Sequence, residues 1–255
     1  MLAIAINSAS AWLIVALVCA LIVAGLVKGA IGVGMPIVAF PLVSMLIGVQ
    51  ASVMLLTMPL ILSNIPQALG GGETVPCLFG LMPVLLGMVP GIFLGITALL
   101  HVNEHIAKLL AGIVVILVVI LMTAAPKLKI NRRAQTPIGI GVGFFGGMLG
   151  GVAAMPGPLV FTYLIAKGLR GQAFTKEASL FLVLSAALMA SILASTRNFD
   201  PKDVVISTVA LAPVSLGMYF GQKLRDRIPA EAFKRLVLLV VLVSGLQLLQ
   251  NGVFS

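Results

Sequence analysis

The chain carries very little charge for its 255 residues: only 9% are Asp, Glu, Lys or Arg, and only seven are acidic. A soluble globular domain carries about 25% charged residues, so this chain could not cover a surface exposed to water. It also lacks the long polar stretches of disordered or nucleic-acid-binding chains, despite its net charge of +9. These absences exclude a soluble globular protein, a disordered chain and a nucleic-acid partner.

Potential metal ligands and catalytic groups are equally scarce. The two cysteines, Cys19 and Cys77, lie in apolar runs with no metal-binding spacing around them. His101 and His105 are four residues apart, but a metal site would need further ligands nearby. No pair of acids lies deep within an apolar segment, as a membrane protease or a carboxylate-based cation transporter would require. We therefore predict no enzyme activity, no metal and no cofactor.

Apolar segments make up most of the chain, in which 60% of the residues are hydrophobic. A helix rises about 1.5 Å per residue and the hydrocarbon core is roughly 30 Å thick, so most of these segments can cross a membrane. Three are too short (35–48, 136–150 and 156–167), and Gly/Pro breaks beside them indicate either re-entrant hairpins or single broken helices. The segments lie at 11–27, 35–48, 51–69, 76–100, 105–125, 136–150, 156–167, 173–195, 203–222 and 233–250.

These segments predict an all-α polytopic membrane protein. The first segment is expected to be a retained membrane helix and not a signal peptide, because no basic residue precedes it and no clear cleavage site follows it.

Two halves of the chain share Gly- and Pro-containing motifs in the same order. GLVKGAIG at 25–32 aligns with GFFGGMLG at 143–150, and a Met-Pro pair follows in each half. Farther along, LMPVLLGMVPGIFL at 81–94 aligns with LAPVSLGMYFGQKL at 211–224, with eight of fourteen positions identical. We therefore predict two transmembrane repeats, 1–126 and 134–255, joined by a basic linker at 127–133. Each repeat is expected to hold one broken helix pair and three transmembrane helices.

Basic residues gather in the linker, at 167–177 and at 223–235. The positive-inside rule places all three segments in the cytoplasm, with both termini outside. Each half then makes an odd number of crossings, which gives the repeats inverted topology. Parallel repeats are the alternative, but they would put the linker and 223–235 on opposite faces. Inverted repeats are a transporter architecture, in which substrate binds at the midplane where broken helices meet.

The broken-helix motifs are KGAIGVGMP at 28–36 and GGMLGGVAAMPGP at 146–158. Glycine permits unwinding and proline suits the first turn, so each motif predicts a helix, an unwound Gly-rich stretch and a new helix near the proline. Free N–H groups at the new helix starts favour an anion, whereas close helix packing is the alternative. We assign to the substrate site Gly32, Gly34, Met35, Pro36, Gly150, Gly151, Met155, Pro156 and Gly157.

Charged residues inside apolar segments are candidates for function. Lys28 is the only basic residue before Lys108. A cation in lipid is costly, so Lys28 is expected either to pair with an anionic substrate or to snorkel to the interface. Glu177 is the acid nearest an intramembrane position. It could take part in proton coupling or pair with Lys176 or Arg170.

Side-chain amides and hydroxyls complete the predicted substrate site. Asn64 and Gln67 are three residues apart, so one helix face presents two amides. These amides would donate to sulfonate or carboxylate oxygens, or would form hydrogen bonds between helices. The second half offers Thr162 and Tyr163.

At these motifs the sequence resembles the sulfite exporter TauE/SafE family of membrane permeases, which carries a Gly-rich motif ending in Pro-Leu once per half. The matching stretches are GLVKGAIGVGMPIVAFPLV and GFFGGMLGGVAAMPGPLVFTYL, and PLILSNIPQALGGG at 59–72 resembles a subgroup. The family's triple-glycine core is here GVG and GGV. The resemblance implies a multi-pass inner-membrane carrier that exports small sulfur-containing or carboxylate anions by alternating access, with an anion channel as the alternative. The resemblance is compatible with protons as the coupling ion and with a homodimer.

Overall fold

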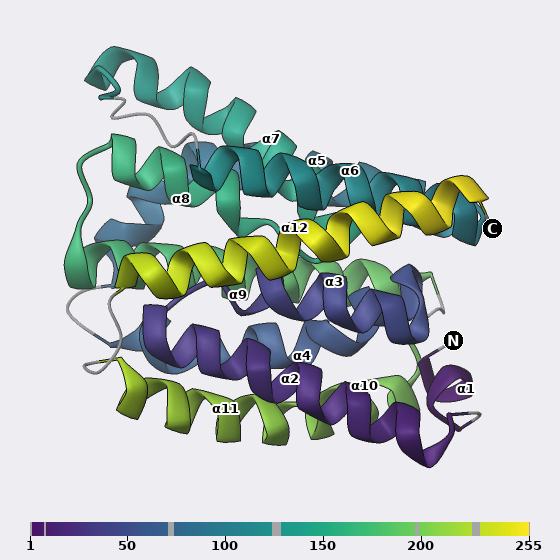
Figure 1. Cartoon of the computed structure of the whole chain (residues 1–255). Coiled ribbons are helices and arrows are strands. Elements are labelled where there is room, and N and C mark those ends of the chain that lie inside the picture. The colour runs from purple at the N-terminus through teal and green to yellow at the C-terminus, as the bar shows by residue number, and fades with distance from the viewer. Residues whose placement is uncertain are drawn as a thin grey trace.

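Each apolar segment predicted from the sequence forms helix in the computed structural model, which describes residues 2–7, 9–70, 74–123, 129–196, 199–225 and 230–254 (Figure 1). The first half contains α1 (Leu2–Asn7), α2 (Ala11–Ile31), α3 (Met35–Ile47), α4 (Val49–Leu69), α5 (Thr74–His101) and α6 (Glu104–Thr123). The second contains the 3-10 helix η1 (Arg132–Ala134), α7 (Gln135–Ala153), α8 (Gly157–Ala166), α9 (Gly171–Ser195), α10 (Pro201–Val209), α11 (Leu211–Leu224) and α12 (Ala230–Phe254). The described residues contain no strand, which confirms the all-α class.

Eight helical stretches of the described residues are long and apolar enough to cross a membrane, with α10 and α11 counted as one. The two shorter apolar helices, α3 and α8, have 13 and 10 residues. At about 1.5 Å per residue neither spans a hydrocarbon core of roughly 30 Å. Each packs back against the helix before it, α3 on α2 and α8 on α7. The Gly/Pro breaks are therefore turns in helix hairpins and not kinks in single helices.

The segment predicted at 203–222 is divided at Ala210, where α10 ends and α11 begins. Pro213 has no N–H to donate to the carbonyl four residues earlier, at Val209, so the regular helical ladder is interrupted there.

A proline inside α4 is compensated by a neighbouring helix. Pro59 has no N–H for the Leu55 carbonyl, which a continuous helix would otherwise satisfy. The Ser207 hydroxyl of α10 donates to that carbonyl at 2.8 Å, and its oxygen accepts the Met58 N–H at 3.0 Å. A buried backbone group without a partner is costly in a membrane. Ser207 therefore satisfies α4 and links it to α10.

Two helix pairs that join the halves pack at backbone contact through glycine, and we call them the glycine seams. One pairs α2 with α11, and a Cβ on Gly25 or Gly217 would overlap the backbone of the opposing helix. The other pairs α5 with α7, where the same is true of Gly87 and Gly143. The seam glycines are Gly25, Gly29, Gly217 and Gly221 in the first, and Gly87, Gly91, Gly95, Gly143, Gly147 and Gly151 in the second.

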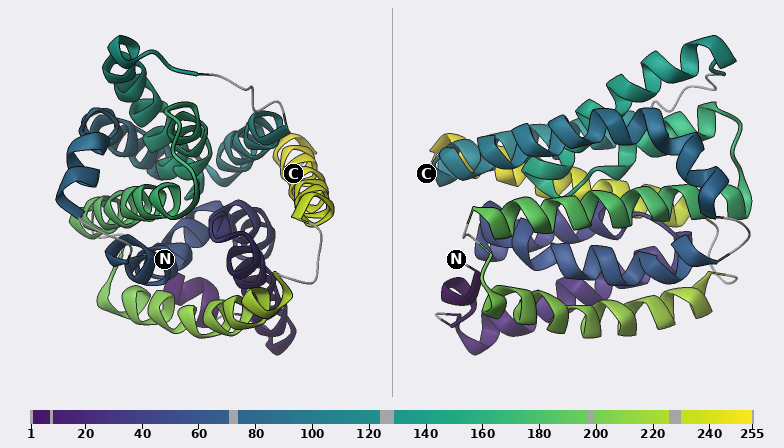
Figure 2. Two further views of the ribbon diagram at one scale, coloured as in Figure 1. Left: turned by 90° about the vertical axis from the view of Figure 1, so that its left-hand side faces the viewer. Right: turned by 180° about the vertical axis from the view of Figure 1, so that it is seen from behind.

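The seams explain why the sequence repeats. Gly25 aligns with Gly143 and Gly87 aligns with Gly217 in the repeated motifs. In space, the first motif of each half packs against the second motif of the other half. The most extensive of the other contacts between the halves join corresponding helices, since α4 packs on α9 and α6 packs on α12 (Figure 2).

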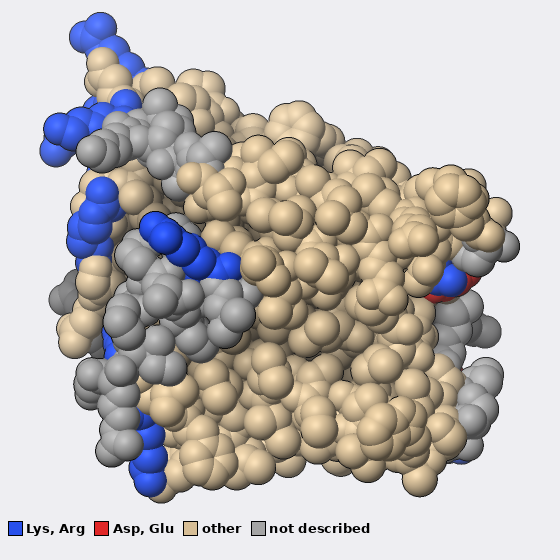
Figure 3. Space-filling model, viewed as in Figure 1, with Lys and Arg blue, Asp and Glu red and all other residues tan. Residues whose placement is uncertain are grey.

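Lys and Arg side chains gather at the end of the bundle where α7 begins, as Figure 3 shows for one face. Lys129, Arg132 and Arg133 are exposed there. Some of the charged residues counted in the sequence lie outside the described residues: Glu73, Lys127, Arg197, Asp226 and Arg227.

Candidate functional site

The first break lies between α2 and α3. Gly32 and Gly34 have φ angles of 92° and 100°, a region that favours glycine. The Gly32 N–H donates to the Lys28 carbonyl at 2.7 Å and closes α2. Met35 and Pro36 form the buried first turn of α3, and no side chain caps that turn. The predicted order of helix, unwound glycines and new helix is confirmed here, and the free N–H groups of α3 carry partial positive charge.

The second break differs from the prediction. Gly150 and Gly151 are helical, so the expected unwinding of the Gly-rich stretch is wrong. Gly151 packs at the α5–α7 seam, and a Cβ on Gly150 would press on Pro156. The chain turns at 154–156 instead, with Ala154 at a φ of 51°, the only positive φ of a non-glycine among the described residues. Gly157 then begins α8, and Met155 is buried in the turn.

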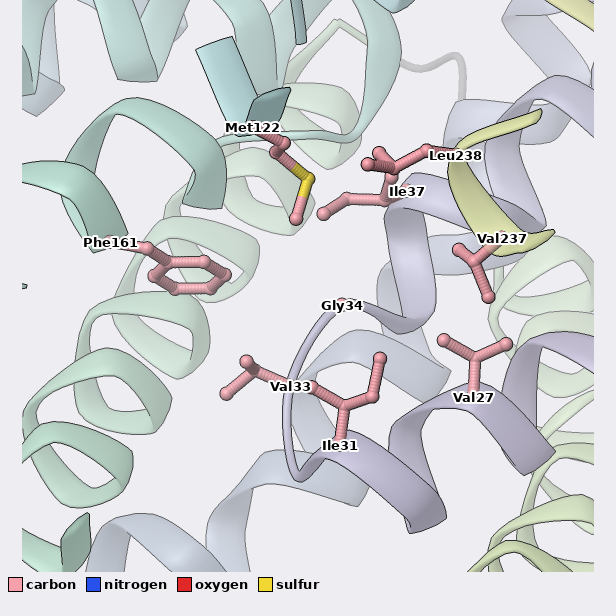
Figure 4. A pocket seen from close by; sticks show the side chains of 9 residues that line it. All are labelled: Val27, Ile31, Val33, Gly34, Ile37, Met122, Phe161, Val237 and Leu238. Carbon is pink, nitrogen blue, oxygen red and sulfur yellow. The ribbon is translucent and has the colours of Figure 1, made fainter. Parts of the chain in front are cut away.

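The two hairpins border one cavity (Figure 4). It has a volume of about 50 Å³ and lies between Gly34 at the start of α3 and Phe161 on α8. The other lining residues are apolar: Val27, Ile31, Val33, Ile37, Met122, Val237 and Leu238. Polar groups for an anion must therefore come from beside this apolar cavity.

Lys28 provides the strongest such group, and it points toward α4. Its ammonium donates to the Ser63 hydroxyl at 3.0 Å and to the Asn64 side-chain oxygen at 2.5 Å. The residue is only 1% exposed, so it does not snorkel to the interface. Among the ion pairs of the described residues, none involves Lys28. Lys28, Ser63 and Asn64, the Lys28 cluster, thus hold a buried positive charge one turn from the first break.

The amides predicted on α4 have different partners. The Asn64 amide nitrogen donates to the Leu60 carbonyl at 2.7 Å while its oxygen accepts from Lys28. Gln67 lies one turn farther on, and its side-chain oxygen accepts from the Ser179 hydroxyl of α9 at 3.0 Å. The structure therefore brings Asn64 to Lys28, whereas Gln67 joins α4 to α9.

Thr162 and Tyr163 on α8 use their hydroxyls within the second half. Thr162 donates to the Pro158 carbonyl of its own helix at 3.0 Å. Tyr163 donates to the Gln135 carbonyl at the start of α7, also at 3.0 Å. Neither forms a hydrogen bond with the Lys28 cluster.

A family model described as Sulfite exporter TauE/SafE matches residues 17–248. The chain belongs to the sulfite exporter TauE/SafE family. The match includes both breaks and the Lys28 cluster, and it confirms the resemblance seen in the motifs. As a TauE/SafE member with eight candidate spans among its described residues, the chain is a multi-pass membrane transporter. No curated protein and no solved structure matches the chain.

This TauE/SafE protein has a second buried polar cluster, which the sequence did not predict. The Lys167 ammonium lies 3.9 Å from a Glu177 carboxylate oxygen and donates to the Gly80 carbonyl at 3.1 Å. It also lies 5.6 Å from the centre of the Tyr163 ring. Arg170, a predicted partner of Glu177, donates to backbone carbonyls instead. We call Tyr163, Lys167, Glu177 and the Gly80 carbonyl the Glu177 cluster.

Proposed function

We propose that this transporter exports small sulfur-containing or carboxylate anions, such as sulfite or a sulfonated carboxylate, across the inner membrane by alternating access. The buried Lys28 ammonium carries the proposal, because it is held by two neutral side chains, Ser63 and Asn64. A buried charge without a counter-charge is costly within a bilayer. An anionic substrate supplies the missing charge in this position.

The starts of α3 and α8 support the same substrate class. Both helices begin inside the bundle, at the turns of their hairpins, and neither start has a side-chain cap. Uncapped N–H groups at a helix start attract anions. We place the substrate between these starts and Lys28. The proposed contacts are Lys28, Asn64, Gly32, Gly34, Met35, Pro36, Met155, Pro156 and Gly157, with Gln67, Gly150, Gly151, Thr162 and Tyr163 holding the surrounding helices in place.

Alternating access follows from two inverted repeats, 1–126 and 134–255, connected by the linker 127–133. The pairing of unlike motifs at the two glycine seams supports a two-fold relation between the halves. Their first long helices, α2 and α7, begin at opposite ends of the bundle (Figure 1), which favours inversion. The cavity between the hairpins is small, about 50 Å³, and apolar, which favours a carrier over an anion channel, since a channel needs a continuous path for ions.

Thermal unfolding of the purified protein with sulfite, thiosulfate, methanesulfonate and acetate tests this proposal. A ligand that binds only the folded state stabilises it by roughly 2.7 kcal/mol at about 100 times its Kd. We expect sulfite to raise the melting temperature of the wild type and of the exposed-site control Lys129→Met, but not of Lys28→Met. An equal shift in all three proteins would remove Lys28 from the site. Counterflow exchange of labelled sulfite without electrical current distinguishes the carrier from the channel.

A further inference from the structure

We propose that Glu177 binds a coupling proton and loses its ion pair with Lys167 on protonation; this rests on the proposed anion transport. Glu177 lies on α9 and is 9% exposed. Its carboxylate oxygen Oε2 is buried and has no hydrogen-bond partner among the described residues. The same atom is 3.9 Å from the Lys167 ammonium, too far for a hydrogen bond. The carboxylate therefore has a buried oxygen available to take a proton.

Lys167 does not depend on Glu177 for its position. Its ammonium donates to the Gly80 carbonyl of α5 and lies over the Tyr163 ring. Protonation makes Glu177 neutral and gives it an O–H donor. Because only a long ion pair is lost, Glu177 can change its charge while Lys167 stays held between α8 and α5.

The surroundings of Glu177 contain few other groups that titrate. Of the helices packed against α9, α4 and α7 contain no titratable side chain. The other titratable or charged groups on α5, α8 and the start of α9 near Glu177 are Cys77, Tyr163, Lys167, Arg170 and Lys176. Glu177 is the only acid among them. Proton binding at Glu177 therefore removes the one negative charge among these described groups, which are otherwise basic or neutral.

Helix α9 connects this proton site to the proposed anion site. Ser179, two residues after Glu177, donates to Gln67 on α4. Gln67 is one turn from Asn64, which accepts from Lys28. Loss of a negative charge beside these helices strengthens anion binding, and by linkage anion binding promotes proton uptake. The transporter is thus expected to move a proton together with the anion.

Calorimetric titration of the full-length protein in buffers with different heats of ionisation measures the protons taken up on binding. Methanesulfonate is the first probe, because it stays ionised and any proton must bind the protein. We expect the wild type to take up protons and to lose affinity as the pH rises. Glu177→Gln should bind without uptake or pH dependence, yet retain counterflow of labelled methanesulfonate, since exchange moves no net proton. Glu104→Gln on α6, which keeps an acceptor for the Val49 N–H, is the matched control.

A second titration uses sulfite and compares the wild type with Glu177→Gln, so that proton binding by sulfite itself cancels. Glu177→Asp keeps a titratable carboxyl and should restore uptake. Should Glu177→Gln not fold, infrared difference spectra of the wild type must show a protonated carboxyl band on anion binding. Three results would each overturn the proton site: wild-type proton uptake in Glu177→Gln, anion binding without proton uptake in the wild type, and absence of that band. Failure of the wild type to bind either anion instead overturns the proposed function.

Discussion

The charge on Lys28 can be neutralised by changing one atom of its partner. Asn64→Asp keeps the shape of the side chain but places a carboxylate where an amide oxygen accepts from Lys28. An ion pair in this position compensates the ammonium and repels an incoming anion. We expect sulfite to bind more than about tenfold more weakly, a loss of about 1.4 kcal/mol. The melting temperature without sulfite should change little, because the new ion pair with Lys28 offsets the loss of the hydrogen bond that the Asn64 amide donates to the Leu60 carbonyl.

Asn103→Asp is the matched control for this substitution. Asn103 is exposed before α6, where its side chain accepts the Ile106 N–H at 2.9 Å, and Asp caps a helix as well as Asn. Sulfite titrations by calorimetry and melting curves compare the two variants. Wild-type affinity in Asn64→Asp would assign Asn64 to packing alone.

At the residue scale, the sequence predicts which side chains are unusual but not their partners. Lys28 stands out because no other basic residue precedes Lys108. Whether it faces lipid, the cavity or α4 depends on the rotation of α2, which the Gly25 seam contact with α11 helps to set. Glu177 is similar, since its distance to Lys167 depends on the turn between α8 and α9. The Lys28–Asn64 contact and the Glu177 cluster therefore required the structure.

At the element scale, the glycine seams predict a large effect from a single methyl group. In Gly25→Ala the new Cβ would overlap the Val214 carbonyl of α11, which is backbone and cannot rotate away. We expect destabilisation of about 1–3 kcal/mol, as is typical of overpacking. Gly141→Ala is the control, because Gly141 is helical on α7 and its Cβ would meet nothing within 4 Å. That substitution should be neutral or stabilising by up to about 1 kcal/mol.

Thermal unfolding in detergent, without ligand, compares the two alanine variants with the wild type. The sequence repeat predicts one more result. Gly143→Ala at the α5–α7 seam should lower the melting temperature as Gly25→Ala does, since its Cβ would overlap the carbonyl of Val84, the valine that aligns with Val214. Equal melting temperatures for Gly25→Ala and Gly141→Ala would show that the seam tolerates separation of the helices.

Sequence patterns predict the helices well and their breaks only in part. Hydrophobic length and Gly/Pro punctuation predict all ten long or short apolar helices. The same patterns cannot distinguish a glycine that unwinds a helix from one that packs it, because both uses require the absence of a side chain. Gly34 belongs to the first kind and Gly151 to the second, and the difference lies in the opposing backbone of α5. Ala154 in a left-handed conformation carries no sequence signal at all.

At the scale of the whole molecule, the two halves are joined more extensively than the linker suggests. Both glycine seams cross between the halves, as do the α4–α9 and α6–α12 contacts. The proposed alternating access requires the two halves to rock about these contacts while each hairpin keeps its shape. The apolar cavity between Gly34 and Phe161 lies between elements of different halves, so rocking of this kind would open it.

The orientation of the halves can be tested by cysteine labelling with a membrane-impermeant maleimide in intact cells. In a background with Cys19 and Cys77 replaced by alanine, we introduce Asn103→Cys, Lys129→Cys or Lys223→Cys, all at exposed positions. The positive-inside rule places Lys129 and Lys223 in the cytoplasm and Asn103 outside. Only Asn103→Cys should therefore react before permeabilisation. Parallel repeats would put residues 129 and 223 on opposite faces, so reaction of just one of these two cysteines would contradict inversion. If both reacted and Asn103→Cys were protected, the whole protein would have the opposite orientation in the membrane.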